Sequence, residues 1–324
     1  MNTTFVLGAG FSVDASDPKM PLARELRERV ISFIKFDRHS SYRALLDRSY
    51  EYPQGLFYAG LEQIDPTGTL QFEELFSQFR RQGITSKSEG PAYVAEWVLR
   101  IGCARLFWCL HGLNPFPEAY YRNLASWMFR EARSSHSRNT VVSFNWDVVA
   151  ETALAEAHIP WSYSLSVPAT VPVLKPHGSI NWNRYLRENL TNDSRLWRPI
   201  GSESCFSYPA ETPLKNPDQQ GGSPDLNLML FPGDPDLPGQ DMDLRRIWGD
   251  VETALAESNK VVFIGYSLPD YDSFASTFFN NHISGEVEIY NPSPQDRQKY
   301  KDLFGDRIVK EDEGFSSCPY AQEG

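Results

Sequence analysis

The sequence has no paired cysteine motif. Its four cysteines are Cys103, Cys109, Cys205 and Cys318, and no two of them have the spacing of a zinc-binding pair. A structural zinc site is therefore disfavoured, and we expect no metal. Cys103 and Cys109 fall on one predicted helix, too far apart to bond. We interpret all four cysteines as buried or surface thiols in a reducing cytoplasm.

Basic residues and long apolar runs are also scarce. The 31 Lys and Arg against 42 Asp and Glu give a net charge of -11. A nucleic-acid surface needs clustered basic residues, so we expect no direct nucleic-acid binding. No run reaches the about 18 apolar residues of a membrane span. The N-terminal apolar run is too short for a signal peptide and lacks its basic region. We expect a cytoplasmic protein without membrane contact.

The chain does contain apolar strand patterns that alternate with helical ones. This alternation predicts an α/β fold with a doubly wound, mostly parallel, Rossmann-like sheet. Strands are expected at 3–7, 140–144, 171–175, 261–264, 286–290 and 307–309. Helices are expected at 22–34, 146–157 and 244–255, where apolar residues keep helical spacing.

Two insertions interrupt this pattern. Residues 1–35 and 135–311 form the expected catalytic core, and 36–134 an inserted helical module. Its signals are a stripe of Phe72, Leu75, Phe76 and Phe79, an apolar helix over 91–110, and the aromatics Trp97, Phe107, Trp108, Tyr120, Tyr121 and Trp127. Residues 183–243 are expected to be a long irregular insertion, since 201–243 hold seven Pro and five Gly. The polar tail, 312–324, is expected to fray.

Four short motifs are the main functional signal. They are Gly8-Ala9-Gly10-Phe11-Ser12, Asn145-Trp146-Asp147, Lys175-Pro176-His177-Gly178-Ser179 and Gly265-Tyr266-Ser267. Each lies at the end of a predicted strand. Ligands of open α/β sheets bind at the carboxyl ends of the strands, so the motifs are expected to meet in one crevice.

Gly8 and Gly10 suit a pyrophosphate, because glycines let the backbone approach and a helix start offers free N–H groups. A conventional dehydrogenase is disfavoured, because no second strand ends in an acidic residue about 20 residues further on. Asn145 and Asp147 could also simply cap the following helix.

His177 stands apart from the other histidines. It lies in a turn shaped by Pro and Gly at a strand end, whereas His39, His111, His136, His158 and His282 lack that context and are interpreted as structural. Gly265-Tyr266-Ser267 and Asn291 follow strands as well and suit a phosphate or ribose. Each can also be an ordinary turn residue, so the inference depends on their order and joint placement.

In that order, the motifs resemble those of the sirtuin-like superfamily, specifically its bacterial NAD-hydrolysing branch. The matching residues are Gly8-Ala9-Gly10-Phe11-Ser12, Asn145-Trp146-Asp147, His177-Gly178, Gly265-Tyr266-Ser267 and Asn291. Two features of the family's deacylases are missing. There is no four-Cys zinc module, and Lys19-Met20-Pro21-Leu22 replaces the Pro-Asp-Phe-Arg stretch. Both departures disfavour deacylation, but cleavage of the nicotinamide–ribose bond of NAD+ stays compatible with the sequence.

The resemblance implies a role for each motif. Asp147 would hold the nicotinamide end, Asn145 would position water or the ribose, and His177 would act as general base. Asn291 would bind the adenosine ribose. The remaining cofactor-binding residues are Gly8, Ala9, Gly10, Phe11, Ser12, Gly265, Tyr266 and Ser267.

The implied activity is an NAD+ hydrolase that releases nicotinamide and ADP-ribose, with NAD+ as substrate and no metal. In this branch the activity often serves phage defence by depleting NAD+. Because no sensor domain is visible, we expect control by a homo-oligomer or by a partner protein such as an ATPase or nucleic-acid sensor. Two alternatives remain open: a protein deacylase or ADP-ribosyltransferase, and a catalytically silent sensor of NAD+ or ADP-ribose.

Overall fold

The structure is a computed structural model of the 324-residue chain. It describes residues 1–15, 19–36, 54–72, 119–135, 137–185, 196–199, 207–208, 227–229, 242–270 and 272–322, together with scattered positions between 74 and 110.

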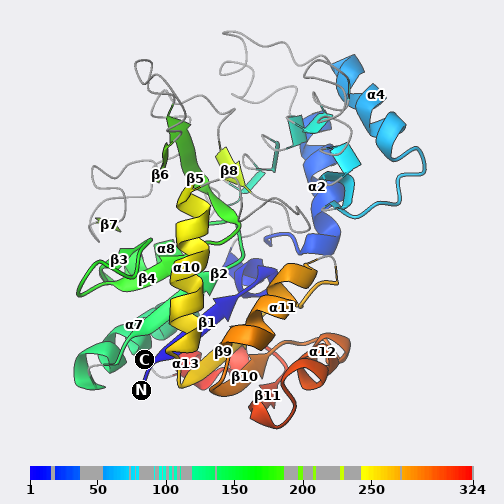
Figure 1. Cartoon of the computed structure of the whole chain (residues 1–324). Coiled ribbons are helices and arrows are strands. Elements are labelled where there is room, and N and C mark those ends of the chain that lie inside the picture. The colour runs from blue at the N-terminus through cyan, green and yellow to red at the C-terminus, as the bar shows by residue number, and fades with distance from the viewer. Residues whose placement is uncertain are drawn as a thin grey trace.

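An eight-stranded sheet forms the centre of the molecule, in the order β11-β10-β9-β1-β2-β4-β3-β7 (Figure 1). Its strands are β1 (Thr3–Leu7), β2 (Asn139–Ser143), β3 (Trp161–Ser162), β4 (Val171–Leu174), β7 (Ser207–Tyr208), β9 (Lys260–Ile264), β10 (Glu286–Tyr290) and β11 (Ile308–Asp312). Every neighbouring pair is parallel except β3 and β7. The predicted doubly wound, mostly parallel, Rossmann-like α/β fold is confirmed.

The strand order reverses between β1 and β9. From β1 the chain builds outward to β2 and β4 on one side, and later to β9, β10 and β11 on the other. Leu7 pairs with Ser143 of β2 and with Ile264 of β9, so the three strands end level with one another. In open α/β sheets the crevice at such a reversal is where ligands bind.

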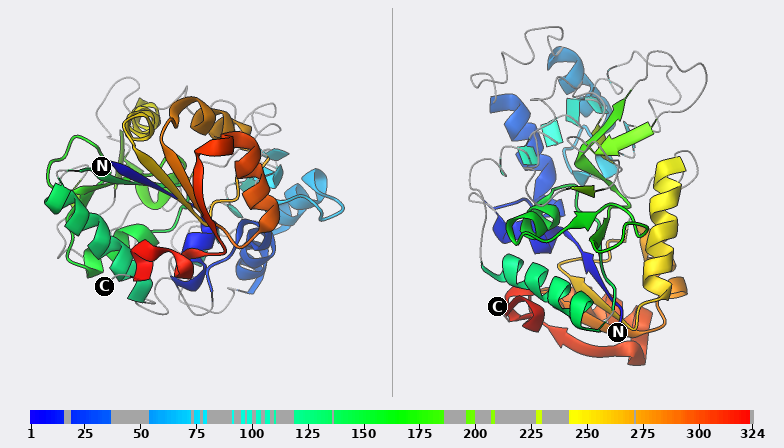
Figure 2. Two further views of the ribbon diagram at one scale, coloured as in Figure 1. Left: turned by 90° about the horizontal axis from the view of Figure 1, so that it is seen from below. Right: turned by 90° about the vertical axis from the view of Figure 1, so that its left-hand side faces the viewer.

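Helices cover both faces of the sheet (Figure 2). Phe5 contacts Trp127 of α7 (Ala119–Ser135) and Tyr320 of α13 (Pro319–Gln322). Phe263 contacts α11 (Ser273–His282) and α12 (Pro294–Phe304). Phe5 pairs with Val262, and side chains alternate along a strand, so Phe5 and Phe263 lie on opposite faces. Helix α10 (Met242–Ala256) packs beside α11 through Trp248 and Phe274.

The described part of the inserted module is helical. It includes α4 (Gln54–Ile64) and follows α2 (Ala23–Phe36) of the core. The predicted stripe of Phe72, Leu75, Phe76 and Phe79 is fully buried, and the described positions of 91–110 are helical too. Helix α7 lies with the core instead, since it packs on β1. Trp97, Trp108, Cys109, His39 and His111 lie outside the described residues, as does the side chain of Tyr120.

The insertion predicted to be irregular contains strands. β5 (Gly178–Tyr185) pairs antiparallel with β6 (Leu196–Pro199) and β8 (Asn227–Met229) in a second sheet. The expectation for 183–243 is therefore wrong for these segments, because Pro and Gly between them did not prevent local pairing. Cys205 and the other residues between the strands lie outside the described residues.

The frayed C-terminal tail is also a wrong prediction. Residues Phe315–Ser317 form a 3-10 turn and α13 follows. Cys318 and Ala321 are buried, and Tyr320 packs on Phe5 and Trp127. Aromatic contacts between distant parts of the chain hold a segment whose own composition is polar.

Cys103 and Cys318 are free thiols, both buried. Among the helices that the structure describes, none has the length and apolar character needed to cross a membrane.

Candidate functional site

A cavity of about 600 Å³ opens at the carboxyl edge of the sheet, at the strand-order reversal. It is lined by residues of all four motifs and by Asn291: Gly8, Ala9, Gly10, Ser12, Asn145, Trp146, Asp147, His177, Gly265, Tyr266 and Ser267. The inserted module contributes Gln71, Glu74 and Phe107. Residues more than 250 positions apart therefore share one site, as the strand-end argument predicts.

Two glycine loops cross at the base of this cavity. The N–H of Gly8 donates to Ile264 O at 3.0 Å, and that of Gly10 to Gly265 O at 2.9 Å. A Cβ atom on Gly8 would lie 2.4 Å from Tyr266 Cα, and one on Gly265 would lie 2.4 Å from Gly10 C. The glycines are required because the two backbones touch.

A short helix, which was not predicted, directly follows the first glycine loop. α1 (Ala9–Ser12) has four residues and leads into the 3-10 turn Val13–Ala15, and α2 begins only at Ala23. The loop therefore does not open onto a long helix, and its fit to a phosphate comes from backbone approach. Phe11 is buried against Tyr121 and Phe315 and does not line the cavity, so only its backbone can take part in binding.

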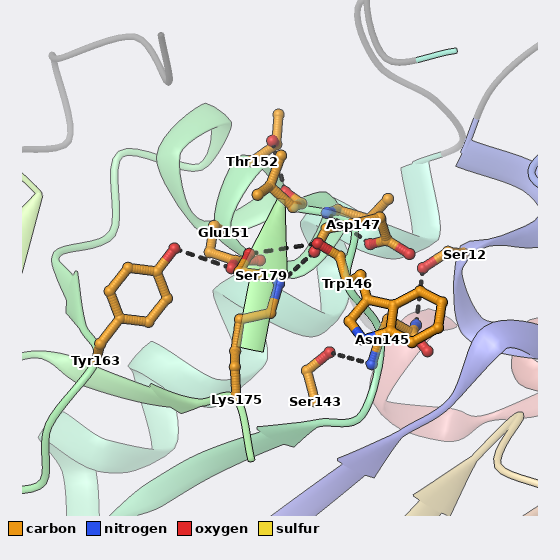
Figure 3. Close-up of polar contacts among 12 residues, drawn as sticks. Ser12, Ser143, Asn145, Trp146, Asp147, Glu151, Thr152, Tyr163, Lys175 and Ser179 are labelled. Atoms are coloured by element: carbon orange, nitrogen blue, oxygen red, sulfur yellow. Dashed lines mark hydrogen bonds and ion pairs between the residues drawn. The ribbon is translucent and has the colours of Figure 1, made fainter. Parts of the chain in front are cut away.

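Asn145 joins the first glycine loop to the β2 end of the sheet (Figure 3). Its side-chain Nδ2 donates to Gly8 O at 2.8 Å and to Ser12 Oγ at 3.0 Å. Because a carbonyl oxygen can only accept, the bond to Gly8 fixes which end of the amide is nitrogen. Both amide hydrogens are thereby used, and Oδ1 is the atom left to accept a hydrogen bond from a ligand.

Asp147 is a buried carboxylate beside Asn145. Burial raises its pKa, while Lys175, the N–H of Val149 and the hydroxyl of Ser12 act in the opposite direction. The N–H of Val149, the first residue of α8 (Val149–Glu156), donates to Oδ1 at 3.0 Å, although the N-cap residue of this helix is Val148 and not Asp147. Asp147 also lines the cavity, where a poorly solvated carboxylate favours a cationic ligand.

Behind Asp147 lies a buried ion pair that the sequence analysis did not assign. Lys175 Nζ lies 3.0 Å from Glu151 Oε1 and donates to the backbone oxygen of Asp147, and both side chains of the pair are fully buried. Tyr163 donates to the same Glu151 oxygen at 3.1 Å. Figure 3 shows this network beside the Asn145–Asp147 turn. It holds the backbone that carries both site residues.

This pair gives a prediction for stability. Lys175→Met leaves the Glu151 carboxylate buried without its cation, and we expect unfolding to become easier by about 3–5 kcal/mol. Lys175→Met combined with Glu151→Gln removes both charges and should recover much of that loss. Urea unfolding followed by circular dichroism measures both variants. Equal losses in the single and double variants would contradict the role assigned to the pair.

His177 lies in the cavity wall with Asp272 as its charged neighbour. Nε2 is 3.5 Å from Asp272 Oδ2, and both side chains are nearly buried. Phe144 packs edge-on to the imidazole at a ring distance of 4.8 Å, and Trp248 lies at 6.3 Å. Burial lowers the pKa of His177, and the Asp272 carboxylate partly offsets this. The imidazole is therefore neutral near pH 7 and able to accept a proton.

Asn291 has a structural role in addition to its place in the cavity wall. Its Nδ2 donates to Tyr266 O at 3.0 Å, and its Oδ1 accepts from the N–H of Ser293 at 2.9 Å. These bonds tie the loop after β10 to the loop after β9. One amide hydrogen remains for a ligand.

Sequence reasoning missed Asp272, Lys175, Glu151 and Trp248. Lys175 was within a quoted motif, and Glu151 follows Asp147 by one helical turn, so both carried a signal. Asp272 ends the sequence Ser-Leu-Pro-Asp-Tyr-Asp, whose Pro and Asp residues are typical of a turn, so it carried no functional signal. His158 and His282, interpreted as structural, do not line the cavity, and His136 lies outside the described residues.

No protein-family model matches the sequence, and no curated protein matches it either.

Several solved structures are similar to the chain. One, described as "Structural Basis for the Mechanism and Regulation of Sir2 Enzymes", has a TM-score of 0.42 and 14% identity, covering 99% of this chain and 88% of the other. A Sir2 homologue mutant in complex with ADP-ribose has a TM-score of 0.40 and 13% identity, covering 99% and 89%. "Structure of Sir2Tm bound to a propionylated peptide" has a TM-score of 0.37 and 11% identity, covering 99% and 90%. Similarity at this level transfers no residue roles, so the function below rests on this chain's own residues.

Proposed function

We propose that this chain is a sirtuin-like NAD+ hydrolase that cleaves the nicotinamide–ribose bond and releases nicotinamide and ADP-ribose. The observation that supports it is the meeting of two glycine loops, an amide, a buried carboxylate and a buried imidazole in one cavity at the strand-order reversal. Each group suits one part of a dinucleotide, and together they come from the ends of β1, β2, β4 and β9.

The charges of the cavity suit a cationic reacting group. Asp147 and Asp272 are both buried, and burial makes their charges poorly solvated by water. The nicotinamide ring of NAD+ carries a positive charge that moves to the ribose as the bond breaks. A carboxylate near this bond therefore favours both the bound substrate and the transition state, and we assign that role to Asp147.

The reaction needs no acid, because nicotinamide leaves as a neutral molecule. The electron pair of the C–N bond goes to the ring nitrogen, and water attacks the cationic ribose carbon. Asn145 Oδ1, the free end of an otherwise fixed amide, orients that water or a ribose hydroxyl. Neutral His177 accepts the proton that is released as the new C–O bond forms.

The rest of the dinucleotide is assigned to the glycine loops. Residues 8–10, Ser12 and 265–267 line the cavity, where close backbone approach suits the phosphates and ribose. Lys299, which also lines the cavity and pairs with Asp270 at 2.9 Å, is a cation available to a phosphate. Asn291 supports this end chiefly by joining the two loops.

The direct test is incubation of the purified chain with NAD+, alone and with the proteins encoded beside it, with products separated by chromatography. We expect nicotinamide and ADP-ribose in equal amounts without any peptide. Nicotinamide release that requires an acyl-lysine peptide, together with one zinc per chain by elemental analysis, would favour a deacylase. Saturable NAD+ binding with no product under either condition would favour a sensor. Either result would reject hydrolysis.

We further propose that the activity serves phage defence by NAD+ depletion and is held in check by assembly. A constitutive NAD+ hydrolase would harm its own cell, so we expect its control to come from a homo-oligomer or from a partner protein such as an ATPase or nucleic-acid sensor. We expect an oligomer by light scattering at micromolar concentration, with turnover that changes when a protein encoded beside it is added. A fully active monomer would contradict this.

A further inference from the structure

Asp272 occupies an unusual position for a residue of the cavity wall. It precedes α11 and accepts a hydrogen bond from the N–H of Ala275 through Oδ1, at 3.2 Å. Its other oxygen, Oδ2, accepts from the hydroxyl of Tyr266 at 3.0 Å and faces His177 Nε2 at 3.5 Å. Both carboxylate oxygens are thus engaged, and the group is 4% exposed.

The surroundings of His177 leave this carboxylate as its charged partner. The imidazole is packed by the rings of Phe144 at the end of β2 and Trp248 of α10. Lys175, two residues earlier, directs its ammonium to Glu151 and to the backbone at Asp147. Among the described residues, Asp272 is the charged group that acts on the His177 imidazole.

We propose that Asp272 is the positioning residue for the catalytic base: its carboxylate, 3.5 Å from Nε2, orients the His177 imidazole, leaves Nδ1 to take the proton, and stabilises the imidazolium that results. This rests on the proposed hydrolysis. As water attacks, its proton passes to Nδ1, the new C–O bond forms, and the C–N electron pair leaves with neutral nicotinamide. The imidazolium then returns the proton to solvent, so the overall reaction releases one proton.

The rigidity of the carboxylate supports this role. A helix start and a tyrosine hydroxyl fix the two oxygens independently of His177, so the imidazole meets a preset partner. A carboxylate beside a buried imidazole favours its protonated form, which burial alone would oppose. Without Asp272 the base would be both less well oriented and a weaker proton acceptor.

The test variant is Asp272→Asn. Asparagine caps helices as well as aspartate does, so α11 should be retained while the charge is lost. We expect the acid limb of kcat/KM for nicotinamide release to move to lower pH, and the plateau to fall by at least about 10-fold. Asp302→Asn, on the exposed face of α12, removes the same charge away from the cavity and serves as the control.

A second measurement does not depend on turnover. Histidine-labelled protein is titrated by NMR as wild type and as Asp272→Asn, with the His177 signal identified by its loss in His177→Gln. We expect the titration of His177 to move to lower pH in Asp272→Asn only. An unchanged titration, or an unchanged acid limb with only a lower plateau, would overturn the proposal. If the His177 titration moves to lower pH in Asp272→Asn but the wild-type protein never releases nicotinamide, the hydrolase is rejected and the pairing is kept. If Asp272→Asn melts much earlier than wild type, Asp272→Ser replaces it as a neutral cap.

Discussion

Asn145→Ala should lower kcat/KM for nicotinamide release by about 10²–10³-fold, the usual cost of losing one fixed polar group at a reacting centre. The side chain does two things at once in this structure. Its Nδ2 fixes the loop of Gly8 and Ser12, and its Oδ1 is presented to the ligand. Removing it loses the orientation of the attacking water. Initial rates by chromatography measure the effect.

The matched control for Asn145→Ala is Ser12→Ala, which removes one of the two partners of the amide. Asn145 then keeps its bond to Gly8, and Oδ1 stays in place. We expect Ser12→Ala to lose less activity than Asn145→Ala. Melting temperatures of both variants should fall only modestly, because a lost buried hydrogen bond costs about 1–3 kcal/mol. A fully active Asn145→Ala protein would remove this residue from the mechanism.

Among substitutions that add one methyl group to the site, Gly265→Ala should lower the unfolding free energy most. Gly265 has φ +61, and its added Cβ would lie 2.4 Å from Gly10 C and Phe11 N. Strained backbone and overpacking each cost about 1–3 kcal/mol, so we expect a loss of about 2–6 kcal/mol in unfolding free energy. The two glycine loops must separate to admit the methyl, so NAD+ turnover should be lost as well.

Gly305→Ala separates the two causes. Gly305 has φ +54, but nothing lies within 4 Å of the Cβ position. Both glycines have a positive φ, so both variants carry backbone strain, and the steric clash is absent at Gly305. Urea unfolding should therefore show the larger loss in Gly265→Ala, where the clash is added. Equal losses in Gly265→Ala and Gly305→Ala would show that contact between the loops does not matter.

Strands β1, β2, β4, β9 and β10 could be predicted because each is a short apolar run that ends at a motif or at Asn291, whereas the two-residue strands β3 and β7 were missed. Thr3–Leu7 and Glu286–Tyr290 were predicted with their observed bounds. The motifs lie together because they follow the carboxyl ends of neighbouring parallel strands, as the sequence analysis predicted. The C-terminal segment was not predicted, because contacts with residues far away in the sequence stabilise it. The tail helix α13 depends on the packing of Tyr320 against Phe5 and Trp127, which no local pattern reveals.

Other misses had local causes. Helix α11, Ser273–His282, has aromatics at helical spacing but ends in Asn, Asn and His, which are weak helix formers. Helix α12, Pro294–Phe304, is polar along most of its length, although Ser293 caps it and Pro294 opens it. Asp272 belongs to the first of these helices, so missing the helix hid the partner of His177. The ion pair of Lys175 and Glu151 was hidden because charged residues are expected at the surface.

The measurement that tests the hydrolase most directly compares the NAD+ turnover of wild type with that of His177→Ala, after their melting temperatures are shown to be equal. Each is incubated with NAD+, alone and with proteins encoded beside it, and nicotinamide and ADP-ribose are quantified together. We predict equal amounts of both products from wild type, and at least about 100-fold slower release from His177→Ala. Full-rate release by His177→Ala, or no release by wild type under any of these conditions, would contradict the proposed function.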